Sequence, residues 1–233
     1  MLLFINPMTI LLAAAVIPAI VLLVEVYKYD RLEPEPPNLL LRLVLMGVIS
    51  TFIALIGERI GSSIAASLYP EDSLAYYAFL MYFVVGLSEE GAKYLMLRRS
   101  TWNSPDFNCR YDGVIYAVFV SLGFALWENI MYVFSYGIGT AMLRAVTAIP
   151  GHASFGVFMG TWYGLAKKMQ MEGREDLSTL YRTISVLLPL LVHGTYDLIA
   201  TIGLDWIFFV FIAIVFLFSF TTVKRISARD EYL

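Results

Sequence analysis

The sequence contains only one cysteine and two histidines in 233 residues, and charged residues make up just 15% of it. With Cys109 alone, the chain has no internal disulfide framework and no thiolate cage for a metal ion. The net charge of −3 provides no basic surface of the kind that nucleic acid requires, so we expect no nucleic acid partner. Hydrophobic residues make up 59%, which leaves too little polar surface to cover a soluble globule. The chain is therefore predicted to be an integral protein of the lipid bilayer.

Seven mostly apolar runs are long enough to cross the bilayer as helices, which needs about 17 to 25 residues. They are approximately residues 9–26, 39–55, 74–97, 113–135, 140–166, 184–202 and 206–223. Short polar segments rich in proline and charge connect them, namely residues 27–37, 58–73, 98–112, 136–139, 167–182 and 203–205. Helices satisfy their own backbone hydrogen bonds in lipid. The sequence therefore predicts an all-α, polytopic membrane helix bundle of about seven transmembrane helices, formed as a single domain over residues 1–233.

The lysines and arginines separate between the two sides of this seven-span topology. One side holds Lys28, Arg31, Arg42, Arg98, Arg99, Arg110, Lys167, Lys168, Arg174, Arg182, Lys224, Arg225 and Arg229. The other side holds Arg59 and Arg144, and Lys93 lies within a span. The positive-inside rule then predicts an external N-terminus and a cytoplasmic C-terminus in a cell membrane. The first run lacks a basic n-region, so we interpret it as a retained span and not as a secretory signal.

Ionisable side chains inside the predicted spans are the main indication of function. Each costs about 2.5 to 3.5 kcal/mol at the bilayer centre, so such residues face a bundle interior or a water-filled cavity. At about 1.5 Å per helical residue, the depths of five of them run from about 13 to about 24 Å. These five are Glu89, His193, Asp197, His152 and Glu128. Similar depths on different spans indicate one shared site near the middle of the membrane.

Two of these groups come from the third and fourth spans. Glu89 and Glu90 precede Lys93 by four and three residues, so both carboxylates lie within one turn of the lysine. One carboxylate can therefore be ion-paired while its neighbour stays available for proton transfer. In the fourth span, Phe124 lies one turn before Glu128, which has no basic neighbour in the sequence. Glu128 must therefore find a partner on another helix or remain protonated, and both outcomes imply a polar interior. An interfacial ion pair and a structural interhelical hydrogen bond remain the alternatives for these acids.

The fifth span presents a histidine at the head of a smooth ridge. His152 follows Pro150 and Gly151, and glycines recur at four-residue steps at positions 156, 160 and 164. Small residues at this spacing let a second helix approach closely, so we expect His152 to point into the bundle. Pro150 is expected to loosen the helix just before it. A histidine that serves packing alone is the alternative.

The sixth span places an imidazole and a carboxylate one turn apart. His193 and Asp197 are four residues apart, a spacing at which a carboxylate can fix the tautomer of a histidine and stabilise its protonated form. The same spacing is common in helices. Inside a membrane span, however, two ionisable residues are costly, which favours a functional role over chance.

In order and spacing, these motifs across residues 87–197 resemble those of PrsW-type proteases, intramembrane enzymes related to the type II CAAX prenyl proteases. The resemblance implies a glutamic-type intramembrane endopeptidase. Members of this family cleave membrane-anchored protein substrates such as anti-sigma factors in bacterial signalling. The CAAX relatives have a histidine where Glu128 stands here, which argues against a prenylated substrate.

A direct attack by water is the mechanism that the spacing and the resemblance together indicate, because no serine or cysteine forms a recognisable nucleophile motif. Glu89 is expected to act as general base. Glu90 and Lys93 form the supporting pair, and His193 polarises the scissile carbonyl or protonates the leaving amine. Asp197 is expected to orient the ring of His193.

Glu128 and His152 are expected to complete the water site, beside Phe124. We expect no cofactor, with a zinc ion as the alternative because the two histidines and one or two glutamates could supply its ligands. The His-Glu-x-x-His motif is absent.

A proton-coupled transporter also uses buried acids and histidines, although no internal repeat is evident. A non-enzymatic scaffold is the third alternative, and the sequence does not indicate an oligomeric state.

Overall fold

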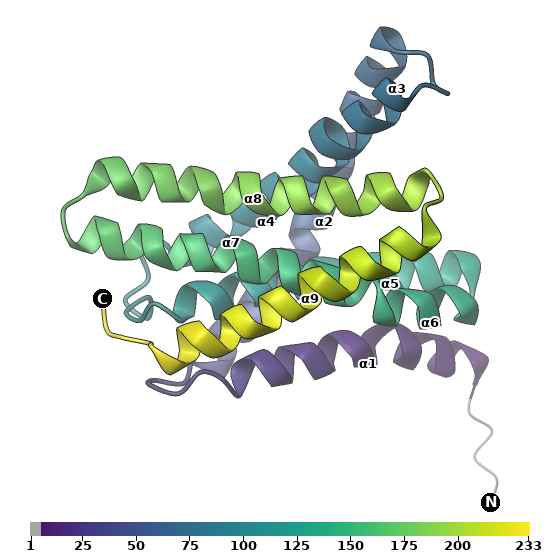
Figure 1. The fold of residues 1–233 in the computed structure, drawn as a ribbon. Coiled ribbons are helices and arrows are strands. Elements are labelled where there is room, and N and C mark those ends of the chain that lie inside the picture. The colour runs from purple at the N-terminus through teal and green to yellow at the C-terminus, as the bar shows by residue number, and fades with distance from the viewer. Residues whose placement is uncertain (1–5) are drawn as a thin grey trace, which may run out of the picture.

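The computed structural model describes residues 6–233, and nearly all of this part of the chain is helical. In chain order the elements are α1 (Pro7–Tyr27), α2 (Pro37–Leu68), α3 (Leu74–Phe79), the π-helical segment η1 (Leu80–Gly86), α4 (Leu87–Thr101), α5 (Asp112–Tyr136), α6 (Ile138–Val146), α7 (Ala148–Met171), α8 (Glu175–Thr201) and α9 (Asp205–Ala228). Because α3, η1 and α4 follow one another without a break and α6 is only nine residues long, the described chain contains seven long helical segments, the number of the predicted apolar runs. Figure 1 shows how they are arranged.

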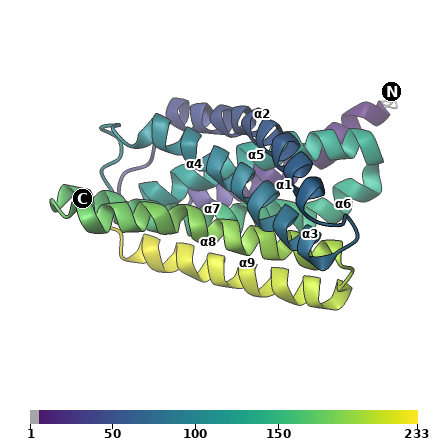
Figure 2. The ribbon, with the colours of Figure 1, turned by 90° about the horizontal axis from the view of Figure 1, so that it is seen from above.

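The bundle has a buried centre and an apolar outer layer. Helices α4, α5 and α7 lie between α2 on one side and α8 and α9 on the other when the bundle is seen from above (Figure 2). Most of α5 is buried, whereas α1 and α9 expose large apolar side chains along most of their length. Among the described residues, five helices are long and apolar enough to cross a membrane: α1, α2, α5, α8 and α9. The prediction of a polytopic membrane helix bundle is confirmed.

Glycines bring α5 and α7 into close contact at the centre. A Cβ atom at Gly160 would lie 2.3 Å from the carbonyl oxygen of Gly113, and one at Gly156 would lie 2.9 Å from the Cα atom of Val118. Larger side chains at these positions would force the two helices apart. The predicted glycine ridge is therefore the face of α7 that packs on α5, and it fixes the position of His152 at its head.

The second helix is longer than predicted. The expected span of residues 39–55, with a loop over 58–73, was wrong because α2 continues to Leu68. Polar and small residues lower the hydropathy of the added segment, but two of its glycines pack against the third helical segment. A Cβ at Gly57 would lie 2.6 Å from Oγ of Ser88, and one at Gly61 would lie 2.7 Å from Val84. This packing stabilises the helix where composition alone indicates a loop.

The predicted fifth span of residues 140–166 is divided into α6 and α7. The break lies at Thr147, whose φ of −121° and ψ of −73° are not helical. The ring of Pro150 would clash with the carbonyl group of residue i−4, which is Val146, the last residue of α6. The helix therefore ends there and starts again, and α6 turns back over the end of the bundle.

The predicted loop of residues 167–182 is also too long. Only residues 172–174 are non-helical, where Gly173 has a φ of +75°. Helix α8 begins at Glu175, and Glu175 and Asp176 in its first turn interact favourably with the helix dipole. Hydropathy identifies the part of a helix that contacts hydrocarbon. A polar first turn that extends beyond the hydrocarbon is therefore missed.

Buried acids gather at the end of the bundle where most lysines and arginines lie. Glu35, in the loop between α1 and α2, is only 4% exposed, and its Oε2 atom has no hydrogen-bond partner. Burial, together with the nearby charge of Asp112, raises the pKa of Glu35 to about 9. Asp30 in the same loop accepts a hydrogen bond from the amide of Glu35, and burial raises its pKa to about 6.

We expect the thermal stability of the bundle to fall as the pH rises from about 5 to about 9. Across this window the folded chain retains a proton on Glu35 that the unfolded chain, with an ordinary glutamate pKa of 4.5, has lost. Stability therefore decreases with increasing pH. Thermal unfolding in detergent at several pH values measures this effect. Glu35→Gln should flatten the profile, whereas Glu71→Gln, at an exposed position between α2 and α3, should leave it unchanged. Equal profiles for wild type and Glu35→Gln would contradict the assignment.

Candidate active site

Helix α4 supplies two carboxylates and the lysine between them. The Nζ atom of Lys93 lies 3.1 Å from Oε2 of Glu89 and 2.8 Å from Oε1 of Glu90, as the i, i+4 and i, i+3 spacings predict. Lys93 and Glu90 are fully buried, and Glu89 is 6% exposed. Both acids follow directly after η1, and π-helical turns are frequent at functional sites.

Helix α8 brings His193 to these carboxylates. Its Nδ1 atom lies 2.8 Å from Oε1 of Glu90, so a proton on Nδ1 is donated to that carboxylate. Its Nε2 atom lies 3.9 Å from Oε2 of Glu89 and 3.4 Å from Oδ2 of Asp197. The ring of Phe155 stacks on the imidazole at a centroid distance of 4.6 Å. The strongest orienting contact of His193 thus comes from Glu90, while Asp197, the orienting group predicted from the sequence, lies at the other ring nitrogen.

The π-helical segment fixes the position of α8. The hydroxyl groups of Tyr82 and Thr195 are hydrogen-bonded at 2.8 Å, and a Cβ atom at Gly194 would lie 2.5 Å from the ring of Tyr82. Because His193 lies one residue before Gly194 and two before Thr195, these contacts also fix its position along the bundle axis.

His152 connects α4 to a second acidic group. Its Nδ1 atom lies 3.1 Å from Nζ of Lys93, and its Nε2 atom lies 3.0 Å from Oε2 of Glu128. An ammonium group has only donors, so Nδ1 accepts and the ring proton resides on Nε2, which donates to Glu128. Phe124 lies beneath this group, with its ring centroid 4.1 Å from Nζ of Lys93.

Glu128 finds its basic partner on α6. The Nη2 atom of Arg144 donates to Oε2 of Glu128 at 2.7 Å, and its Nε atom donates to Oδ1 of Asn129 at 2.9 Å. The guanidinium group also covers the ring of Tyr132 at 4.2 Å. Of the two outcomes expected for Glu128, a partner on another helix is the one that the structure shows, and α6 is the element that supplies it.

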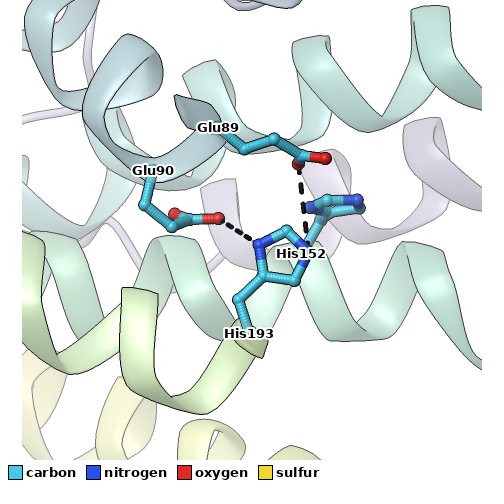
Figure 3. Close-up of side chains that lie close together, drawn as sticks. All are labelled: Glu89, Glu90, His152 and His193. Atoms are coloured by element: carbon cyan, nitrogen blue, oxygen red, sulfur yellow. Dashed lines mark hydrogen bonds and ion pairs between the residues drawn. The ribbon is translucent and has the colours of Figure 1, made fainter. Parts of the chain in front are cut away.

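The side chains of three helices converge on one point. Glu89 and Glu90 from α4, His152 from α7 and His193 from α8 point toward one another (Figure 3), and each offers an atom within 4.8 Å of the others. Beside them is a cavity of about 640 Å³. Its lining includes most of the predicted site, namely Glu89, Phe124, Glu128, His152, His193 and Asp197. All eight residues predicted from the sequence are therefore neighbours, since Glu90 and Lys93 lie directly behind this lining.

Two charged residues of the cavity were not predicted from the sequence. Arg144 was assigned to the outer side of the topology, and Glu58 was assigned to a loop, yet both line the cavity. The positive-inside rule leaves the outer side poor in basic residues. An arginine on that side indicates an acidic partner, and this signal would have identified Arg144. Glu58 reaches the cavity because α2 extends beyond the predicted span, and the sequence pattern does not show this extension.

The donor set is of a kind that zinc binds. Two imidazole nitrogens and carboxylate oxygens are typical ligands of catalytic zinc sites, and Glu89, Glu90, His152 and His193 supply both types. Lys93 competes with such an ion, because its ammonium group is the hydrogen-bond partner of Glu89, Glu90 and Nδ1 of His152. The residues fit a zinc ion in type, and its binding requires Lys93 to move away from at least one of them.

If the site hydrolyses peptide bonds, as the sequence resemblance implies, we expect Arg144→Gln to lower the turnover number by about tenfold to a hundredfold, because a hydrogen bond to a charged group is worth about 1.5 to 3 kcal/mol. The variant leaves Glu128 with His152 as its remaining partner. Glu128 would then be free to turn away from His152. The turnover number of purified protein measures the effect, and Arg144→Lys should recover part of it. An unchanged turnover number for Arg144→Gln would show that Arg144 does not position Glu128.

Comparison with known proteins places this site in a family. The model of a family described as "PrsW family intramembrane metalloprotease" matches residues 35–223. Protease PrsW of Bacillus subtilis (strain 168) is 32% identical over 220 residues, which cover 94% of this chain and 96% of the relative. Protease PrsW of Oceanobacillus iheyensis is 35% identical over 190 residues, covering 81% and 82%, and that of Clostridioides difficile (strain 630) is 34% identical over 197 residues, covering 82% and 79%. No solved structure matches the chain. The chain belongs to the PrsW family of intramembrane proteases.

Proposed function

We propose that this protease is of the glutamic type and cleaves a membrane-anchored protein with a water molecule activated by Glu89. The observation that carries the proposal is the pairing of Glu89 with His193 across the cavity. Their nearest atoms are 3.9 Å apart, too far for a direct hydrogen bond and close enough for one water molecule to contact both. Both side chains line the cavity, where a peptide bond can reach them.

The surrounding charges prepare both groups for proton transfer. Lys93 donates hydrogen bonds to both Glu89 and Glu90, so the two acids share one ammonium group in a buried site. Glu89 then accepts a proton from the attacking water. Glu90 accepts a hydrogen bond from Nδ1 of His193, which directs the Nε2 atom into the cavity. In the imidazolium form, which carries a proton on both ring nitrogens, Nε2 can donate its proton to the carbonyl oxygen or to the leaving amine while Nδ1 still donates to Glu90.

His152 and Glu128 form the opposite wall of the water site. The chain of hydrogen bonds from Lys93 through His152 to Glu128 and Arg144 fixes the imidazole ring and the carboxylate. Fixed donors around a reacting centre stabilise developing charge without reorganisation during the reaction.

A membrane-anchored substrate fits the shape of the cavity. Three apolar residues of its rim, Phe52, Leu55 and Met131, are 49%, 56% and 52% exposed and lie on the outer surfaces of α2 and α5. The cavity therefore opens sideways toward lipid, so that a transmembrane segment can reach the site from within the bilayer. Single-span regulatory proteins such as anti-sigma factors are the substrate class that we propose.

A metal-dependent peptidase is the second candidate function, supported by the description of the matching family and by the cluster of Glu89, Glu90, His152 and His193. These four residues would hold the ion, and zinc, when bound, would polarise the scissile carbonyl and acidify a water molecule. In that case Lys93 would neutralise the carboxylates in the metal-free site and would move away from at least one of them in the metal-bound protein.

Cleavage in liposomes tests both candidates. The purified chain is reconstituted with a library of single-span proteins, and the new termini are identified by mass spectrometry. Cleavage that survives prolonged treatment with a zinc chelator, in protein without stoichiometric metal on elemental analysis, supports the glutamic type. Activity that chelation removes and zinc restores supports the metal-dependent type. Solute flux without any cleavage would contradict both.

A further inference from the structure

A second concave site lies between α4 and α8, away from the protease cavity. The groove has a volume of about 440 Å³. Two arginines line it, Arg98 in the last turn of α4 and Arg182 in the first half of α8. The other lining residues are Tyr94, Thr179, Thr183, Val186 and Leu187. Because α8 begins at the basic end of the bundle, Val186 and Leu187 lie about one turn deeper than Arg182. The groove thus has a cationic outer part and an apolar inner part.

The positive charges of this groove are not neutralised by the protein. Among residues 6–233, no carboxylate oxygen lies within 4.0 Å of a guanidinium nitrogen of Arg98 or Arg182. Nη2 of Arg182 donates to Oγ1 of Thr179 at 2.8 Å, and its guanidinium group lies 5.3 Å from the ring of Trp102. Its Nε atom is buried without a hydrogen-bond partner and is therefore not accessible to a ligand. Thr179 and Trp102 thus hold the guanidinium group in place, and no hydrogen bond within the described chain uses its Nη1 atom.

We propose that this groove binds the phosphate headgroup of an anionic phospholipid. Guanidinium groups bind phosphate oxygens through paired, charge-assisted hydrogen bonds. Basic pockets between transmembrane helices on the cytoplasmic side are suited to anionic headgroups, and the positive-inside rule places this groove on that side. Val186 and Leu187, the latter 50% exposed, offer an apolar surface to the acyl chains. Inorganic phosphate shares the headgroup chemistry but cannot use this surface.

The lipid would link the two helices that form the protease site. Arg98 lies nine residues after Glu89 on α4, and Arg182 lies eleven residues before His193 on α8. Deep in the bundle the same helices are joined by the hydrogen bond between Glu90 and His193. A phosphate bound by both arginines would hold α4 and α8 together at the basic end, where no ion pair joins them in the described chain. This role does not depend on the chemistry of the protease site.

Thermal unfolding of the full chain in lipid nanodiscs tests the proposal. Replacing part of the phosphatidylcholine with phosphatidylglycerol should raise the unfolding temperature by about 4 °C or more, as expected for a ligand that binds the folded state. The double variant Arg98→Gln/Arg182→Gln should lose this increment. The matched control Arg99→Gln/Arg174→Gln removes two exposed arginines outside the groove and should retain it.

Native mass spectrometry gives a second reading that does not depend on stability. The groove variant should bind phosphatidylglycerol about tenfold more weakly than the wild type, while the control variant binds it normally. Equal stabilisation by the two lipids would overturn the proposal. An equal loss of phosphatidylglycerol binding or stabilisation in both double variants would also overturn the proposal, because such a loss would show a general effect of positive charge. Full stabilisation by inorganic phosphate in phosphatidylcholine would assign the site to a free anion and not to a lipid.

Discussion

Glu89→Gln is expected to lower the rate of substrate cleavage by about 100- to 10,000-fold, the usual contribution of a general base. Glutamine has the shape of glutamate but cannot accept a proton from water. The hydrogen bond from Lys93 to position 89 can persist through the side-chain carbonyl group, and Glu90 still balances the charge of the lysine. The variant should therefore fold normally, which thermal unfolding in detergent will verify, while single-turnover cleavage in liposomes measures the rate.

The matched control for this variant is Glu25→Gln on α1, where the carboxylate is 43% exposed and, within residues 6–233, forms an ion pair with Lys28 alone. It makes the same chemical change far from the cavity and should cleave at the wild-type rate. If folded Glu89→Gln cleaves within a few-fold of the wild type, Glu89 is not the base. If Glu89→Gln loses both cleavage and zinc binding while Glu25→Gln retains both, Glu89 is a metal ligand and the metal-dependent candidate is supported.

The seven long helical segments and the neighbourhood of the site were predictable because the bilayer constrains both. Apolar runs of sufficient length have few alternatives to spanning helices, and ionisable residues within them must face a shared interior. The contacts of Lys93 with Glu89 and Glu90 followed directly from helical spacing. The approach of α7 to α5 followed from the glycines of α7.

Features that depend on tertiary packing were not predictable in the same way. The extension of α2 depends on how Gly57 and Gly61 meet the third helical segment, which no local pattern shows. The spacing of His193 and Asp197 correctly indicates proximity, but the partner of each ring nitrogen depends on the arrival of Glu90 from another helix. The break at Thr147 shows the same limit, since Pro150 was recognised but the separate helix α6 that results was not.

Lys93→Met is expected to lower the free energy of unfolding by about 3 to 5 kcal/mol, the usual cost of removing one partner of a buried ion pair. Methionine fills most of the space of the lysine side chain, so the loss reflects charge more than packing. Two buried carboxylates, Glu89 and Glu90, and Nδ1 of His152 would lose their common donor. Unfolding by denaturing detergent in mixed micelles measures the change, and we expect much less folded protein in the membrane.

Two further variants separate charge from the loss of a lysine as such. Lys167 is 9% exposed and donates to the carbonyl oxygen of Trp102 and to Oε1 of Gln170, and among residues 6–233 it forms no ion pair with a carboxylate. Lys167→Met should therefore cost less than Lys93→Met, about 1.5 to 3 kcal/mol, the range for hydrogen bonds to a charged group. Glu90→Gln/Lys93→Met removes one of the unbalanced charges and should be more stable than Lys93→Met alone. A higher stability of the double variant would show that the Lys93→Met variant carries a net negative charge in its core. If Lys93→Met instead matched Lys167→Met in stability, the carboxylates of α4 would not depend on the ammonium group, and the charge balance that we assign to the site would be wrong.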